Sequence, residues 1–139
     1  MKTAKIMITA LIAVLAVTFT GCTASEQDRN VQEETAAYTK ISAEEAKAMM
    51  DKGKVTVVDV RRADEYMDRH IEGAVLVPNE TIGNAMPSEL PDKDATLLVY
   101  CRSGRRSREA AEKLIALGYK HVYDFGGIID WPYATVRGN

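Results

Sequence analysis

The sequence predicts an α/β domain in which helices flank a central parallel sheet of about five strands. Two runs, Val55–Val60 and Ala95–Tyr100, are almost wholly apolar or β-branched, which is typical of strands buried on both faces. Helical patterns separate these runs and three shorter strand-like segments, and such alternation favours a parallel sheet. With 139 residues, 46% of them hydrophobic and 27% charged, the chain is long enough for one such domain but not for two.

The remaining elements are shorter or more amphipathic. Ser42 and Glu45 form a capping-box signature for a helix that runs to about Met50, and Gly53 ends this segment. The strongest helical pattern covers 107–117, with an apolar face and Gly118 directly behind it. Weaker patterns predict strands at 38–41, 74–77 and 121–125 and short helices at 62–68, 81–86 and 127–134.

The amino terminus reads as a targeting segment. Lys2 and Lys5 precede an uncharged, largely apolar run that is too short for a typical membrane-spanning helix. The run ends at Thr18–Cys22, which resembles the lipobox of bacterial lipoproteins, although Phe19 stands where that motif usually has Leu. The resemblance implies cleavage before Cys22 and acylation of its sulfur. An ordinary cleaved signal peptide and an uncleaved anchor are the alternatives.

This interpretation divides the chain into three parts. We expect residues 1–21 to be a signal peptide, residues 22–37 a polar flexible tether, and residues 38–138 the folded domain. Several acyl chains on Cys22 would anchor the protein firmly. We therefore expect an exported protein that faces the periplasm or the cell exterior.

Composition excludes several classes of function. The formal net charge of −2 gives no sign of a nucleic-acid partner, which usually needs a strongly basic surface. The two cysteines, Cys22 and Cys101, stand in such different contexts that separate roles are favoured over a disulfide between them. The two histidines, with the remaining cysteine, lack the spacing of metal ligands, so we predict no metal and no other cofactor.

The chemistry is expected at Cys101, directly after the second buried strand, because ligands bind at the carboxyl ends of strands in parallel sheets. Arg102, Ser103, Gly104, Arg105 and Arg106 follow, and then the strongest helix. Backbone N–H groups of such a loop, the helix amino terminus and nearby guanidinium groups all favour a thiolate or another bound anion. The alternative is a structural cysteine beside solvated arginines.

These residues resemble the rhodanese homology family, whose fold is a three-layer α/β domain. The CRSGRRS segment at 101–107 looks like the active loop of single-domain members. Segments 58–61 and 70–74 resemble the family's first signature, and 126–131 resembles its closing one. Arg69, where Gly commonly precedes the His, and Phe125, where Leu is frequent, depart from the pattern. We expect neither departure to touch the chemistry.

The resemblance implies a sulfurtransferase. Cys101 would take sulfane sulfur from a small anion such as thiosulfate, hold it as a persulfide, and pass it to cyanide, a thiol or a protein sulfur acceptor. Backbone amides of 102–106 would cradle the persulfide, and Arg102, Arg105 and Arg106 would shape an anionic approach. Asp59 and Arg61, at the end of the other long strand, border this place, and we expect Arg61 to pair with Asp59 or Glu65.

Two other functions share these features. Related cysteine-based phosphatases and arsenate reductases use a longer loop, in which five residues separate Cys and Arg. Here four residues separate Cys101 from Arg106, which favours a sulfur atom over an oxyanion the size of phosphate. A persulfide carrier or thiol redox module without turnover needs the same loop and is the other alternative.

Overall fold

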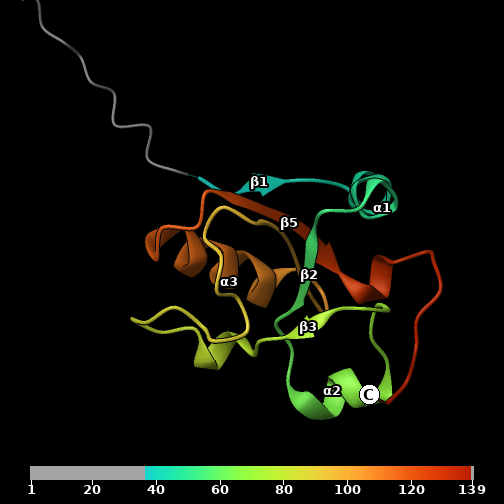
Figure 1. Ribbon diagram of the computed structural model, residues 1–139. Helices are drawn as coiled ribbons and strands as arrows, with labels where there is room; N and C mark the ends of the chain where they lie inside the picture. The colour runs from blue at the N-terminus through green and yellow to red at the C-terminus, as the bar shows by residue number, and fades with distance from the viewer. Residues whose placement is uncertain (1–36, 139) are drawn as a thin grey trace, which may run out of the picture. The chain divides into compact units, whose positions relative to one another are not determined.

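The computed structural model describes residues 37–138, which form one parallel sheet with helices on both faces (Figure 1). All four strand pairings are parallel, and the strand order is β1-β5-β4-β2-β3. The strands are β1 (Thr39–Lys40), β2 (Thr56–Asp59), β3 (Val75–Leu76), β4 (Thr96–Cys101) and β5 (His121–Gly127). The predicted α/β class and five-stranded parallel sheet are confirmed.

Three helices and two short 3-10 turns connect the strands. They are α1 (Ala43–Lys52), α2 (Ala63–Asp68), η1 (Asn79–Thr81), α3 (Arg105–Ala116) and η2 (Ile128–Asp130). The predicted capping box starts α1, because the Ser42 hydroxyl accepts the Glu45 N–H at 3.1 Å and the Glu45 carboxylate accepts the Ser42 N–H at 2.8 Å. Gly53 follows α1 as predicted.

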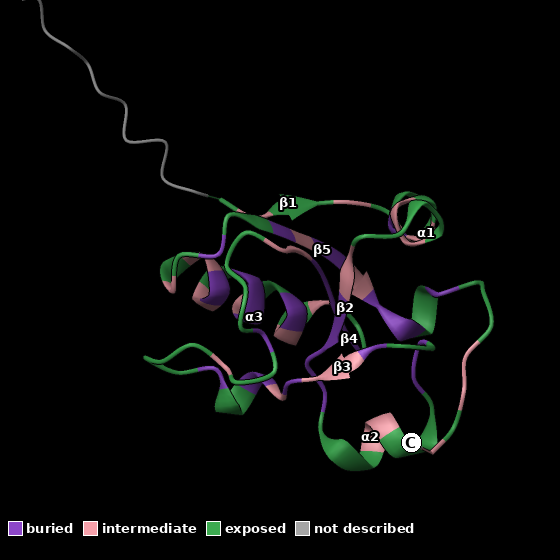
Figure 2. Cartoon of the chain, in the orientation of Figure 1, coloured by how far each residue is buried: buried purple, intermediate pink, exposed green. Residues whose placement is uncertain are grey.

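The two faces of the sheet bury different apolar clusters, as alternation along the strands requires. Val58 of β2 and Val99 of β4 pack with α3, whereas Leu98 and Tyr100 of β4 pack with α1 and the segment after β5. Buried residues therefore fill the central strands and the inner face of α3 (Figure 2). The central strands are buried on both sides, and only their ends reach solvent.

Two predicted helices are wrong. The 81–86 segment forms no helix. It starts at the last residue of the short turn η1, and the chain then runs irregularly through Gly83 to Pro87. Glycine and the residue before a proline both disfavour a helix. The 127–134 segment keeps only η2, since Gly127 still pairs in the sheet and Pro132 cannot extend a helical turn. In addition, α3 begins two residues earlier than predicted, at Arg105.

The predicted signal peptide, the lipidated Cys22 and the tether up to residue 36 lie outside the described residues. Within 37–138, no helix has the length and apolar character needed to cross a membrane.

Candidate functional site

Cys101 is the last residue of β4, at the carboxyl edge of the sheet. Its side chain is almost completely buried, and its Sγ accepts a hydrogen bond from the Gly104 N–H at 3.0 Å. Only Arg102, Ser103 and Gly104 separate it from the first turn of α3. Gly104 has a φ of 101°, a left-handed conformation that favours glycine, and this turn aims the N–H at the sulfur.

The loop is held against β5 by an irregularity in the sheet. Val99 pairs with Asp124 and Cys101 pairs with Gly127, so β5 carries one residue more than β4 between these pairs. At Gly127 a Cβ atom would lie 2.2 Å from the Arg102 carbonyl oxygen. The same oxygen accepts the Ile129 N–H at 3.2 Å. The loop is thus pressed onto a position where only glycine fits.

Two buried polar residues, Ser107 and Asp124, fix this contact. The Ser107 hydroxyl lies 3.1 Å from the Gly104 carbonyl oxygen and 3.3 Å from that of Gly126, so it joins α3 to the irregular part of β5. The Asp124 carboxylate accepts the Gly126 N–H at 2.9 Å and the Lys40 ammonium at 3.0 Å. Sequence reasoning missed both residues. Asp124 could have been found from the sequence, because a carboxylate inside a largely apolar strand is rarely buried without a partner.

The arginines that follow Cys101 lie in different surroundings. Arg106 donates two hydrogen bonds to Glu65 of α2, at 2.7 and 2.9 Å. These bonds lower the pKa of Glu65 to about 2 and raise that of Arg106, to which the charge of Cys101 also contributes. Arg105 instead pairs with Glu109 one turn along α3, at 2.7 Å. Arg106 therefore joins the active loop to α2.

Asp59 and Arg61 form a buried ion pair, as expected. Arg61 donates to both Asp59 oxygens, the shortest contact being 2.6 Å, and the Tyr100 hydroxyl also donates to Asp59 at 2.6 Å. Burial and the negative charge of Asp59 raise the pKa of Tyr100. A second Arg61 hydrogen bond, at 2.6 Å, reaches the Arg69 carbonyl oxygen. Since Asp59 is buried and fully occupied by these donors, its role is to hold Arg61 and Tyr100.

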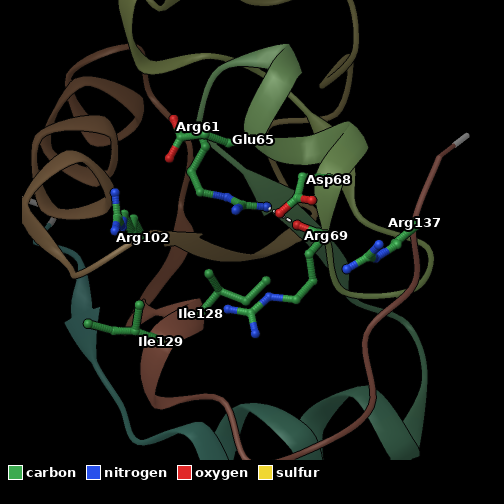
Figure 3. A pocket seen from close by; sticks show the side chains of 8 residues that line it. All are labelled: Arg61, Glu65, Asp68, Arg69, Arg102, Ile128, Ile129 and Arg137. Carbon is green, nitrogen blue, oxygen red and sulfur yellow. Dashed lines mark hydrogen bonds between the residues drawn. The ribbon is translucent and has the colours of Figure 1, made fainter.

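A hollow of about 430 Å³ adjoins the Cys101 loop (Figure 3). It is lined by Arg61, Glu65, Asp68, Arg69, Arg102, Ile128, Ile129 and Arg137. Arg69, which we expected to stay apart from the chemistry, therefore shares a hollow with Arg102, the residue next to Cys101. Cys101 itself does not line this hollow, so the expectation about Arg69 stays a prediction.

Three of the other four predicted loop residues line a second hollow. Ser103, Gly104 and Arg105 line it together with Tyr38 and Lys40. The structure thus does not gather Arg102, Arg105 and Arg106 around one opening, and anion binding by each of them stays a prediction. Among residues 37–138, no three His, Cys, Asp or Glu side chains are placed to hold a metal ion.

This arrangement places one sulfur atom just before the amino terminus of a helix. The Cys101 sulfur receives a backbone N–H, lies at the amino end of a twelve-residue helix, and has the Arg106 guanidinium close by. Such surroundings stabilise negative charge on that sulfur or on an atom bonded to it.

Known proteins resemble this chain in sequence over most of the described domain. A sequence model described as rhodanese-like domain matches residues 42–132. The thiosulfate sulfurtransferase PspE of Escherichia coli is 37% identical over 81 residues, which cover 58% of this chain and 78% of that protein. The thiosulfate sulfurtransferase GlpE of Pseudomonas fluorescens is 35% identical over 107 residues, 73% of this chain and 95% of that protein.

Solved structures show the same fold. A rhodanese with anions from E. coli is 36% identical, has a TM-score of 0.55, and the match covers 60% of this chain and 98% of that one. The rhodanese-like domain of an Anabaena protein is 26% identical with a TM-score of 0.64, covering 70% and 78% of the two chains.

Proposed function

The chain belongs to the rhodanese-like domain family, and on that premise we propose that it is a sulfurtransferase working through a persulfide on Cys101. The donor is a small sulfur-containing anion such as thiosulfate, and the acceptor is cyanide or a thiol. Two curated relatives at 35% and 37% identity are named thiosulfate sulfurtransferase, which supports this reaction.

The reaction has two covalent steps. The Cys101 thiolate attacks the outer sulfur of thiosulfate, a bond forms between the two sulfurs, and the donor's S–S bond breaks, so that sulfite leaves with the bonding electron pair. The acceptor then attacks the outer persulfide sulfur and Cys101 leaves as a thiolate. With cyanide the product is thiocyanate. A thiolate needs no general base.

The Gly104 N–H, which points at the Cys101 sulfur, is the observation that carries the proposal. A persulfide places its negative charge one atom further out, toward the amides and cations of the loop. The short loop and the Arg106–Glu65 pair favour a sulfur atom over a phosphate group, because Arg106 already donates two hydrogen bonds to a carboxylate. We expect no measurable hydrolysis of aryl phosphates.

Steady-state sulfite release tests the proposal. The domain is incubated with thiosulfate and cyanide, and wild type is compared with Cys101→Ala. We expect many turnovers in the wild type and none in the variant. One equivalent of sulfite per protein would instead identify a persulfide carrier, and equal rates in both proteins would remove Cys101 from the mechanism.

We also propose that the protein is exported and anchored through a lipidated Cys22. The support is the sequence itself: Lys2 and Lys5, the apolar run, and Gly21 before the cysteine. Labelling of cells with a fatty-acid analogue should mark the wild type and not Cys22→Ala. Equal labelling of both would exclude lipidation at this residue.

A further inference from the structure

The hollow that Arg102, the residue after Cys101, helps to line carries more positive charge than its own carboxylates balance. Arg61 is neutralised by Asp59, and Glu65 is neutralised by Arg106. Arg69, Arg102 and Arg137 have no ion pair or side-chain hydrogen bond with any residue of 37–138, and Asp68 is the one other carboxylate in the lining. Three cations thus face one anion, an excess that attracts a doubly negative ligand.

Two of these arginines are held in place by backbone contacts. The backbones of His70 and Val136 exchange hydrogen bonds of 2.9 and 2.8 Å, and the Gly138 N–H donates to Met67 at 2.9 Å. Arg137 lies between these fixed points, and Arg69 directly precedes His70. Figure 3 shows both side chains directed into the hollow, with Ile128 and Ile129 along its wall. The last residues of the domain therefore complete this hollow.

The size of the hollow argues against a small ion alone. Its volume of about 430 Å³ falls within the range of roughly 300–1,000 Å³ that holds drug-sized ligands. Arg137 follows the segment 42–132 that matches the family model.

We propose that the hollow binds the sulfur acceptor, and that this acceptor is a thiol bearing two carboxylates. The inference rests on the proposed sulfurtransferase function and specifies its acceptor. Guanidinium groups bind carboxylates through two parallel hydrogen bonds, so Arg69 and Arg137 hold the carboxylates while Ile128 and Ile129 contact the carbon chain. The thiol sulfur then lies at the Arg102 end, beside the Cys101 persulfide.

The transfer step balances without a further reactant. The acceptor thiolate attacks the outer sulfur of the Cys101 persulfide, a new S–S bond forms on the acceptor, and the bond to Cys101 Sγ breaks with its electron pair on Cys101. The products are an acceptor persulfide and the Cys101 thiolate, ready for another donor.

A series of acceptors tests the proposal. Sulfite release is measured at saturating thiosulfate with mercaptoethanol, mercaptopropionate and mercaptosuccinate, which carry none, one and two carboxylates. In the wild type we expect kcat/KM to rise along the series. Arg69→Ala and Arg137→Ala should each lower the value for mercaptosuccinate by about threefold to tenfold, and leave mercaptoethanol and cyanide nearly unchanged.

Arg108→Ala is the matched control, because Arg108 is an exposed arginine of α3 that lines the other hollow. It should keep the wild-type preference for mercaptosuccinate. If Arg108→Ala lowers kcat/KM for mercaptosuccinate as much as the other two variants, the attraction comes from the positive charge of the whole surface, and the proposal is overturned. An equal loss with cyanide in Arg69→Ala and Arg137→Ala would assign the hollow to the donor and overturn it too.

The two proposals fail in different ways. If wild type releases no sulfite with any acceptor, the sulfurtransferase function fails. If cyanide turnover persists but the two arginine variants keep the full preference for mercaptosuccinate, only the acceptor proposal fails. Titration with succinate, a dianion without a thiol, checks the hollow independently of turnover. Binding should be weakened in the Arg69→Ala, Arg137→Ala double variant, and equal binding would contradict the assignment.

Discussion

Replacement of Gly127 by alanine tests how tightly the active loop is positioned. The added Cβ would lie 2.2 Å from the Arg102 carbonyl oxygen, 2.6 Å from the Ser103 Cα and 2.7 Å from the Arg102 carbonyl carbon. All three are backbone atoms, so no flexible side chain can turn aside. The backbone φ of Gly127 is −122°, which any residue adopts, and the effect is therefore purely steric.

The magnitude follows from the required displacement. Ordinary contacts of a Cβ begin above 3.4 Å, so the loop must move by about 1 Å. A misplacement of that size costs on the order of 100-fold in rate when it affects reacting groups, and overpacking costs about 1–3 kcal/mol of stability. We expect Gly127→Ala to fold, to unfold at a lower temperature, and to lose about 100-fold in kcat/KM for thiosulfate and cyanide.

Gly83→Ala is the matched control, because a Cβ there meets nothing within 4 Å and the residue lies in irregular, exposed chain. It should keep full activity. Circular dichroism and thermal unfolding separate loss of fold from displacement of the loop. Wild-type activity and stability in Gly127→Ala would refute the close packing of the loop on β5.

Three further predictions concern hydrogen bonds that stabilise the domain. The pKa of Glu65 is lowered from 4.5 to about 2 by Arg106, so this pair contributes stability that is complete above pH 4.5 and is lost as the pH falls toward 2. Glu65→Gln should lower the free energy of unfolding by about 1–3 kcal/mol at neutral pH and should make this free energy depend less on pH below 4.5. Denaturant titrations that show the same pH dependence in the variant as in the wild type would contradict the pairing. Tyr100→Phe removes the hydroxyl that donates to Asp59 and accepts the Ile71 N–H, and should cost about 1–3 kcal/mol in urea unfolding; no loss would mean that water replaces it. Ser42→Ala removes the cap of α1 and should cost about 1 kcal/mol with unchanged sulfite release, whereas a loss of activity would link α1 to the site.

The sequence predicted the strands and the place of Cys101 at the end of one of them because these signals are local. The buried runs at 55–60 and 95–100 can satisfy their backbone groups and bury their side chains only in a sheet, and Cys101 follows directly from its position behind one of them. The capping residues Ser42 and Glu45 are likewise a contact between close neighbours in the chain.

The missed features depend on contacts between distant segments. Gly127 matters because Arg102 packs on it, and Arg106 is occupied because α2 brings Glu65 to it. No local pattern shows either contact. The false helix at 127–134 has the same origin, because pairing with Cys101 kept Gly127 in the sheet. Arg137 shares a hollow with Arg69 because Val136 pairs with His70 and the Gly138 N–H donates to Met67.

Mass spectrometry of the intact domain after brief incubation with thiosulfate tests most directly whether Cys101 accepts sulfur. The account predicts a gain of one sulfur atom, located on the Cys101 peptide, which disappears on addition of cyanide and does not form in Cys101→Ser. An unchanged mass after treatment with thiosulfate and with polysulfide, in a folded and reduced protein, would contradict it.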